Sequence, residues 1–310
     1  MRDSAGGSAG DAAVAGPGSV PGSGPGSGPV PGAAIWPYAA AVCWLGSLIW
    51  VGTQIGVGGV FAGLGAAVLV MLPVMSALWW LGRRVVEPRT LLNAFVWGAC
   101  VAAAAAIVLQ TAGTALTDNL FGESFTRTFG PLVWTPLTEE VGKGLFVIGM
   151  LIYRRRQING LLDGIVYAGT VGAGFAFTEN SLYLGRAVMG LLAPDASSGF
   201  GIGMIGMTFV MRVLAIPFMH SMFTAMVGIG VVLAVRSTRS AARVAWVGAG
   251  LLVAIALHGL WDWAGLTTGR GFLLFQLYFF VMVPLFVALV VTVLVARRRQ
   301  RRLVTASGSA

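Results

Sequence analysis

Long apolar runs are the feature that most constrains how this chain can fold. From residue 34 onward, apolar stretches recur with short polar breaks between them, and each is near the length of about 20 residues that a helix needs to cross a bilayer core. Eight runs can be delimited, at residues 35–56, 58–82, 90–113, 131–152, 163–185, 203–235, 244–264 and 272–296. The long sixth run is expected to begin in a loop or at the membrane interface. The sequence therefore predicts an all-α, polytopic transmembrane bundle of about eight helices over residues 34–296.

The two ends of the chain differ from this predicted domain. Residues 1–33 consist largely of Gly, Ser and Pro, and such a composition has too little apolar surface to offset the entropy lost on ordering. We expect a disordered cytoplasmic tail there. Residues 297–310 carry the run RRRQRR, which we expect to act as a topology signal and to contact anionic lipid from the cytoplasm.

The basic residues predict the orientation of the bundle, because cytoplasmic loops of membrane proteins carry an excess of Lys and Arg. If the N-terminus is cytoplasmic, fifteen of the twenty basic residues are cytoplasmic and three, Arg127, Arg186 and Arg270, are outside. Both termini are therefore expected in the cytoplasm, in a multi-pass protein of the cell (cytoplasmic) membrane. The basic residues form short clusters rather than a stripe with interleaved aromatics, so nucleic acid is not an expected partner.

Small residues recur at four-residue spacing in the run 163–185. Gly164, Ala168, Gly172 and Ala176 share one helix face, and such a stripe lets two helix backbones approach closely in lipid. We interpret these glycines as a helix-packing surface.

Few ionisable side chains lie inside the apolar runs, and each costs about 3 kcal/mol at mid-membrane, so such residues usually mark function. Lys143 and Arg212 are the basic ones, and Arg212 is interpreted either as an interfacial anchor or as the partner of a carboxylate. The others are Glu139, Glu140, Glu179, His220, His258 and Asp262.

Four of these residues are predicted to lie at one depth in the membrane. Glu139, Glu179, His220 and His258 stand fourteen to sixteen residues from the cytoplasmic ends of their own runs, which converts to about 21–24 Å of helix in each case. The sequence therefore predicts one polar cluster, in the half of the membrane away from the cytoplasm.

Two prolines favour a site that contains water. Pro136 and Pro217 each precede a member of the cluster by three residues, and a proline in a membrane helix frees a carbonyl that polar groups or water must satisfy.

The residue types in the cluster suit hydrolysis. Two adjacent glutamates cannot both ionise easily in a low dielectric, which favours Glu139 or Glu140 as a general base. Lys143 shares a helix face with Glu139 and joins the candidate catalytic residues.

The same cluster offers ligands for a metal. Glu179, His220 and His258 could supply the three protein ligands of a catalytic zinc, with Asp262 orienting His258 from one turn away. Four carboxylates against two cations leave a net charge of −2 in the runs, which either a divalent cation or two protons would neutralise. Zinc-dependent and metal-free mechanisms both stay open.

The polar residues form four motifs within residues 131–265. In chain order they are EExxK (Glu139, Glu140, Lys143), FxxxEN ending at Glu179 and Asn180, a lone His220, and HxxxD (His258, Asp262). These motifs, in this order, resemble those of the PrsW family of bacterial intramembrane proteases. The resemblance implies a protease related to the CAAX-prenyl-protease and bacteriocin-processing group. It also implies that Glu139 and Glu140 are the catalytic carboxylates and that membrane-anchored proteins, such as anti-sigma factors, are the substrates.

Two other classes of protein use buried polar clusters. A proton-coupled transporter would carry an inverted repeat, yet the first three runs have no ionisable residue in their interiors. A non-catalytic membrane scaffold would not require complete motifs. The sequence therefore favours an intramembrane endopeptidase that acts on membrane-anchored proteins.

Overall fold

The structure is a computed structural model that describes residues 35–192, 199–266 and 271–307. The predicted disordered tail, residues 1–33, lies outside the described residues. Within the described ranges every regular element is a helix, in agreement with the predicted all-α class. The α-helices are α1 (Trp36–Gly82), α2 (Pro88–Val96), α3 (Ala103–Phe121), α4 (Glu123–Phe129), α5 (Thr135–Tyr153), α6 (Leu161–Leu192), α7 (Gly199–Phe209), α8 (Met219–Arg236), α9 (Ser240–Leu266), α10 (Gly271–Leu277) and α11 (Val283–Ser307).

Short π- and 3₁₀-helical segments join several of these α-helices. The π-helical segments are η1 (Trp97–Ala102), η2 (Gly130–Trp134), η4 (Val210–Ala215) and η5 (Tyr278–Met282), and η3 (Arg155–Gln157) is a 3₁₀ turn. Because η1 links α2 directly to α3, residues 88–121 form one continuous span that contains the predicted run 90–113.

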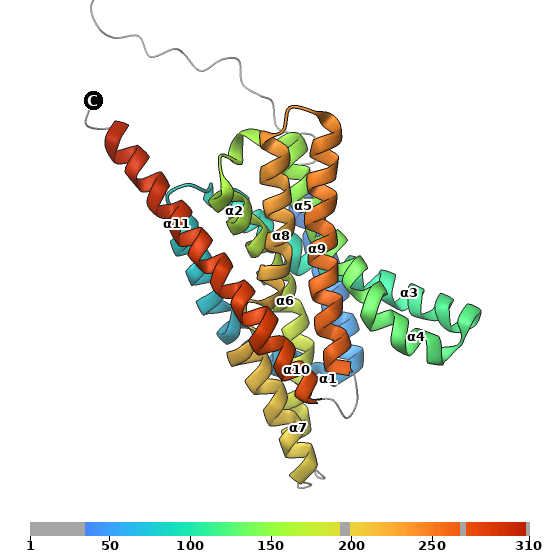
Figure 1. Cartoon of the computed structure of the whole chain (residues 1–310). Coiled ribbons are helices and arrows are strands. Elements are labelled where there is room, and N and C mark those ends of the chain that lie inside the picture. Colours follow the sequence, from blue (N-terminus) through green and yellow to red (C-terminus); the bar gives the residue numbers. More distant parts are fainter. Residues whose placement is uncertain (1–34, 193–198, 267–270, 308–310) are drawn as a thin grey trace, which may run out of the picture. The chain divides into compact units, whose positions relative to one another are not determined.

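Six spans in the described part of the chain are long and apolar enough to cross a membrane, and Figure 1 shows how the helices that form them are arranged. The six spans are Trp36–Gly82, Pro88–Phe121, Leu161–Leu192, Met219–Arg236, Ser240–Gly265 and Phe272–Arg299. The chain is thus a multi-pass membrane protein, while the count of about eight spans and the orientation of the termini stay predictions. Part of the difference in number lies in α1, which joins the predicted runs 35–56 and 58–82 across a kink at Gly56 (φ 71°, ψ 168°).

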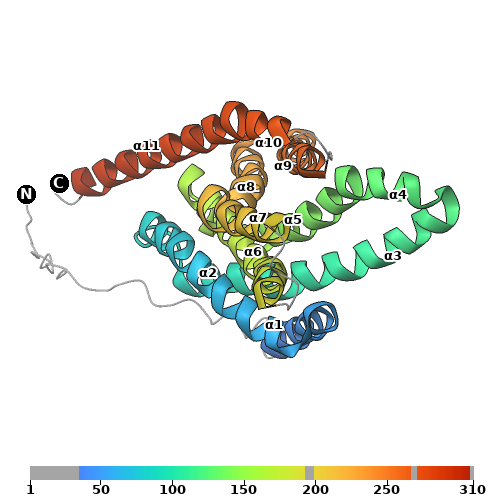
Figure 2. The same cartoon turned by 90° about the horizontal axis from the view of Figure 1, so that it is seen from below.

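Helix α6 lies at the centre of the bundle, with α2, α5 and α8 around it (Figure 2). Its most apolar stretch is 89% buried, and its small residues explain how neighbouring helices come so close. A Cβ added at Gly172 would lie 2.5 Å from the carbonyl oxygen of His220, and one at Gly164 would lie 2.8 Å from that of Gly228. The predicted packing role of these two glycines is therefore confirmed, and their partner is α8.

The predicted run 203–235 divides into two helical parts. Its first part, expected to begin in a loop or at the membrane interface, is helical in α7 and η4 and not a loop, and the helix is interrupted at residues 216–218. Pro217 lies in this interruption, as expected for a residue that disrupts helical hydrogen bonding. Because α8 begins at Met219, His220 lies in its first turn.

Candidate active site

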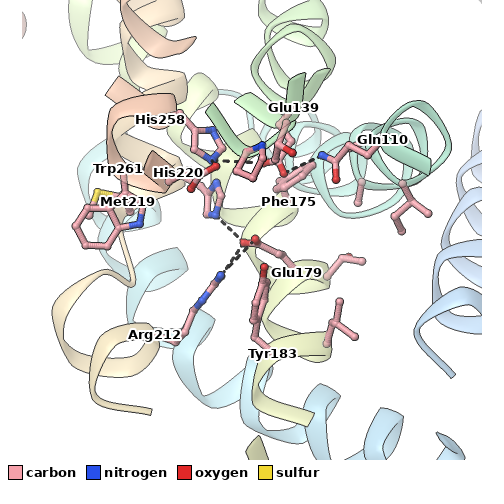
Figure 3. A pocket seen from close by; sticks show the side chains of 18 of the residues that line it. Gln110, Glu139, Phe175, Glu179, Tyr183, Arg212, Met219, His220, His258 and Trp261 are labelled. Carbon is pink, nitrogen blue, oxygen red and sulfur yellow. Dashed lines mark hydrogen bonds and ion pairs between the residues drawn. The ribbon is translucent and has the colours of Figure 1, made fainter. Parts of the chain in front are cut away.

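A cavity of about 640 Å³ lies among the helices that carry the predicted polar residues. Its walls come from α1, α3, α5, α6, α8, α9, α10, η2 and η4, and Figure 3 shows many of the side chains that line it. Polar side chains lining it include Glu139, Glu179, His220, His258 and Asp262. The four residues predicted at a common depth thus border one cavity.

Lys143 lies at the centre of the buried charges. Its side chain is fully buried, and Nζ lies 3.0 Å from Glu139 Oε2 and 2.8 Å from Glu140 Oε1. The ammonium also lies 3.0 Å from His220 Nδ1 and 3.9 Å from the centre of the Phe175 ring. Since a lysine ammonium has only donors, His220 Nδ1 accepts this hydrogen bond. Lys143 therefore connects both glutamates of α5 to the histidine of α8.

His258 is held by the second glutamate of the motif. Its Nδ1 lies 2.9 Å from Glu140 Oε1, and because an ionised carboxylate only accepts hydrogen bonds, Nδ1 carries the proton. The imidazole stacks on the Phe223 ring, with centres 5.1 Å apart. Glu140 is fully buried, and its other oxygen lies 3.3 Å from the Thr224 hydroxyl. Nδ1 thus donates to Glu140, and Nε2 is the nitrogen that faces the cavity-lining carboxylates of Glu139 and Asp262.

Glu179 joins an arginine and the other histidine. Arg212 contacts both carboxylate oxygens of Glu179, at 2.7 Å and 3.4 Å, and stacks over the ring of Tyr183. His220 Nε2 lies 2.7 Å from Glu179 Oε2, so this nitrogen donates while Nδ1 accepts from Lys143. Of the two interpretations of Arg212, the carboxylate partner is the one found.

Asp262 lies on the cavity side of His258. Its Oδ2 is 3.5 Å from His258 Nε2, which is longer than a normal hydrogen bond. The contact that orients His258 at hydrogen-bond distance comes from Glu140 instead, whereas the sequence had suggested Asp262 for this task.

Three donor residues lie close enough to hold a metal ion. One ligand atom from each of Glu139, His220 and His258 falls within 4.8 Å of the others. One carboxylate and two imidazoles are a ligand set that zinc accepts, with a further position left for water. The predicted set had Glu179 where this group has Glu139. Glu179 lies on the far side of His220, against Arg212 (Figure 3).

One polar residue of the site was not singled out from the sequence. Gln110, on α3, approaches Glu139 from the side opposite His258 (Figure 3), and its Nε2 donates to Glu139 Oε1 at 3.2 Å. A glutamine within the apolar run 90–113 was the available signal, since an uncharged polar side chain in lipid also needs a partner.

Residues 87–289, about two thirds of the chain, match the sequence model of the PrsW family intramembrane metalloproteases. No curated protein and no solved structure matches the chain significantly. The matched region contains every helix that supplies a motif residue, and the apolar spans agree with a protease embedded in a membrane. The chain therefore belongs to the PrsW family of intramembrane metalloproteases and is, like that family, a peptidase.

Proposed function

We propose that this protein hydrolyses peptide bonds of membrane-anchored proteins, and that Glu139, His220 and His258 carry the reaction in the cavity. The observation that supports this proposal most directly is that these three side chains, from three different helices, present donor atoms within 4.8 Å of one another. A carboxylate beside two imidazoles suits activation of water and proton transfer to a leaving amine.

The two glutamates of the motif have different tasks in this proposal. Glu139 borders the cavity, so it can accept a proton from a water molecule that attacks the peptide carbonyl. Glu140 lies behind it, fully buried and in contact with His258 Nδ1. Glu140 therefore fixes the orientation of His258 and leaves Nε2 facing the cavity. Lys143, with one positive charge between two carboxylates, offsets part of their negative charge.

Zinc fits the residues present. Glu139, His220 and His258 would hold it, and bound zinc would supply a positive charge that polarises the peptide carbonyl and acidifies water. The hydrogen bond from His258 to Glu140 is the kind that orients zinc-ligating histidines. His220 would bind through Nδ1 in place of the hydrogen bond that this nitrogen accepts from Lys143 in this structure, because an imidazole nitrogen has a single lone pair. Glu139 needs only one oxygen for a metal, which leaves its second oxygen to take a hydrogen bond from water.

The substrates proposed are membrane-anchored proteins of the cell membrane, with anti-sigma factors as the class that the motif resemblance suggests. The apolar surface of the bundle and the cavity between its helices support a substrate that reaches the site from the membrane.

The test compares protein termini in membrane and secreted fractions of cells that carry the wild type or Glu139→Gln. Glu123→Gln is the matched control, because Glu123 is an exposed glutamate on α4 that pairs only with exposed Arg127 in the described structure. We expect at least one membrane protein to be cut near its membrane boundary with the wild type and the control, and not with Glu139→Gln. Identical termini in all three strains would reject the proposal and favour a transporter or a scaffold.

Metal content is a separate measurement on the purified full-length protein. We expect zinc in the wild type and a large loss in His258→Ala. Equal zinc in both proteins would remove His258 as a ligand without affecting the peptidase proposal.

A further inference from the structure

Helix α3 contributes one face to the cavity, although it carries none of the motif residues. Ala103, Ala106, Ile107 and Gln110 line the cavity from this helix, at the three- and four-residue spacing of a single helix face. Only the last of them is polar. Gln110 therefore brings the one hydrogen-bonding side chain of this face to the cavity, and it lies next to Glu139.

The hydrogen bonds around Glu139 divide between its two oxygens. Gln110 Nε2 donates to Oε1 at 3.2 Å, whereas Lys143 Nζ donates to Oε2 at 3.0 Å. Among the described residues, Gln110 is the side chain that donates a hydrogen bond to Glu139 Oε1. Two donors on different oxygens prevent rotation of the carboxylate about its last bond, which a single donor would allow.

Gln110 suits this position because it is neutral. Lys143 already places one ammonium between the glutamates of α5, and a charged side chain in place of Gln110 would add the cost of burying a further charge. An amide donates a hydrogen bond without adding charge. The same amide lies 3.5 Å from the hydroxyl of Thr138, whose hydrogen points to backbone carbonyls one turn earlier in the chain.

The part of α3 that carries Gln110 is fixed against the start of α5. Trp134 Nε1 donates to the carbonyl of Leu109 at 3.1 Å, and a Cβ added at Gly113 would lie only 1.9 Å from the same indole nitrogen. The glycine thus allows α3 to approach Trp134 closely. This approach holds Gln110 within hydrogen-bond distance of Glu139.

We propose that Gln110 is a positioning residue of the peptidase, which orients the Glu139 carboxylate so that Oε2 faces Lys143 and His258. This inference rests on the proposed function of Glu139. Around metal sites, loss of a partner that hydrogen-bonds to a ligand and orients it typically costs about 10–100-fold in metal affinity or activity. The contribution of Gln110 is to geometry, and the proton transfer itself stays with Glu139.

The contact can be tested without a substrate or a metal, by infrared spectroscopy of the full-length protein labelled with ¹³C-glutamate. The sequence contains only five glutamates, so the carboxylate band that disappears in Glu139→Gln identifies Glu139. We expect this band to shift in Gln110→Met, which keeps the length of the side chain and removes the donor. It should stay in place in Thr111→Val, which alters an exposed neighbour about 100° around α3 from Gln110. An unchanged band in Gln110→Met overturns the proposal, and Gln110→Ala gives the same test if the methionine variant does not fold.

Kinetics provide the second measurement, with the membrane protein identified by the comparison of termini as substrate. We expect kcat to fall about 10–100-fold in Gln110→Met, while KM and the melting temperature stay close to those of Thr111→Val. A kcat equal to that of the wild type overturns the positioning role, even where Glu139→Gln is inactive. If Glu139→Gln itself cleaves normally, the proposed function falls, and the infrared band still decides whether Gln110 holds Glu139.

Discussion

Substitution of Gly172 by alanine should displace His220 from its partners. Gly172 lies on α6, two turns before Glu179, and faces the first turn of α8. An added Cβ would lie 2.5 Å from the carbonyl oxygen of His220 and 2.8 Å from the Cα of Ser221. Both are backbone atoms, so no side-chain rotation can relieve the contact. One of the two helices must move.

The size of the movement follows from these distances. An ordinary contact of a Cβ begins at 3.4 Å, so the backbones must separate by about 0.9 Å, the difference between 3.4 and 2.5 Å. Overpacking of this kind costs about 1–3 kcal/mol of unfolding free energy. The hydrogen bond of 2.7 Å between His220 and Glu179 would stretch beyond useful length, and a misplacement near 1 Å can cost about 100-fold in rate.

The assay measures kcat on the substrate identified from the termini, together with equilibrium unfolding in mixed micelles. Gly149→Ala is the matched control, because Gly149 lies on α5, the helix of Glu139, and an added Cβ there meets nothing within 4 Å. We expect Gly172→Ala to lose about 100-fold in kcat and Gly149→Ala to resemble the wild type. Wild-type kcat in Gly172→Ala would refute the reasoning, because it would show that His220 tolerates a shift of α8.

Three other changes have expected outcomes. Lys143→Met removes the cation between two buried glutamates and should lower the free energy of unfolding by about 3–5 kcal/mol; an unchanged unfolding midpoint would contradict the role of that cation. Arg212→Gln frees Glu179 to turn away from His220, so kcat should fall about tenfold with little change in stability. An unaltered kcat would show that the contact of Arg212 with Glu179 does not contribute to the reaction. Trp97→Phe removes the indole hydrogen bond of 2.9 Å to the carbonyl of Gly142 on α5 and should cost about 1 kcal/mol, which equal midpoints for variant and wild type would disprove.

Depth in the membrane could be predicted from sequence alone, because a helix rises by a fixed distance per residue. Counting residues from the ends of apolar runs was enough to predict one level for Glu139, Glu179, His220 and His258, and all four line one cavity. The break before α8 was less visible. Pro217 indicated it, yet the sequence could not show that the chain is helical both before and after the interruption.

The direction in which each side chain points depended on long-range packing. Glu139 and Glu140 differ by about 100° around α5, and the sequence left open which of them faces the reactive centre. In the tertiary structure Glu139 lines the cavity, and Glu140 accepts a hydrogen bond from His258. Gln110 has no motif of its own, and its contact with Glu139 exists only because α3 docks on Trp134 at Gly113.

The sequence by itself determined that this protein lies in a lipid bilayer and which ionisable residues must be buried inside its helical bundle. A bilayer requires long apolar helices, and it makes every ionisable residue within them costly enough to need a partner. Only the tertiary structure decided which partners meet. The rotation of each helix about its axis is set by contacts between helices far apart in the sequence, such as Gly172 against α8, and hydrophobicity in a lipid solvent does not specify that rotation.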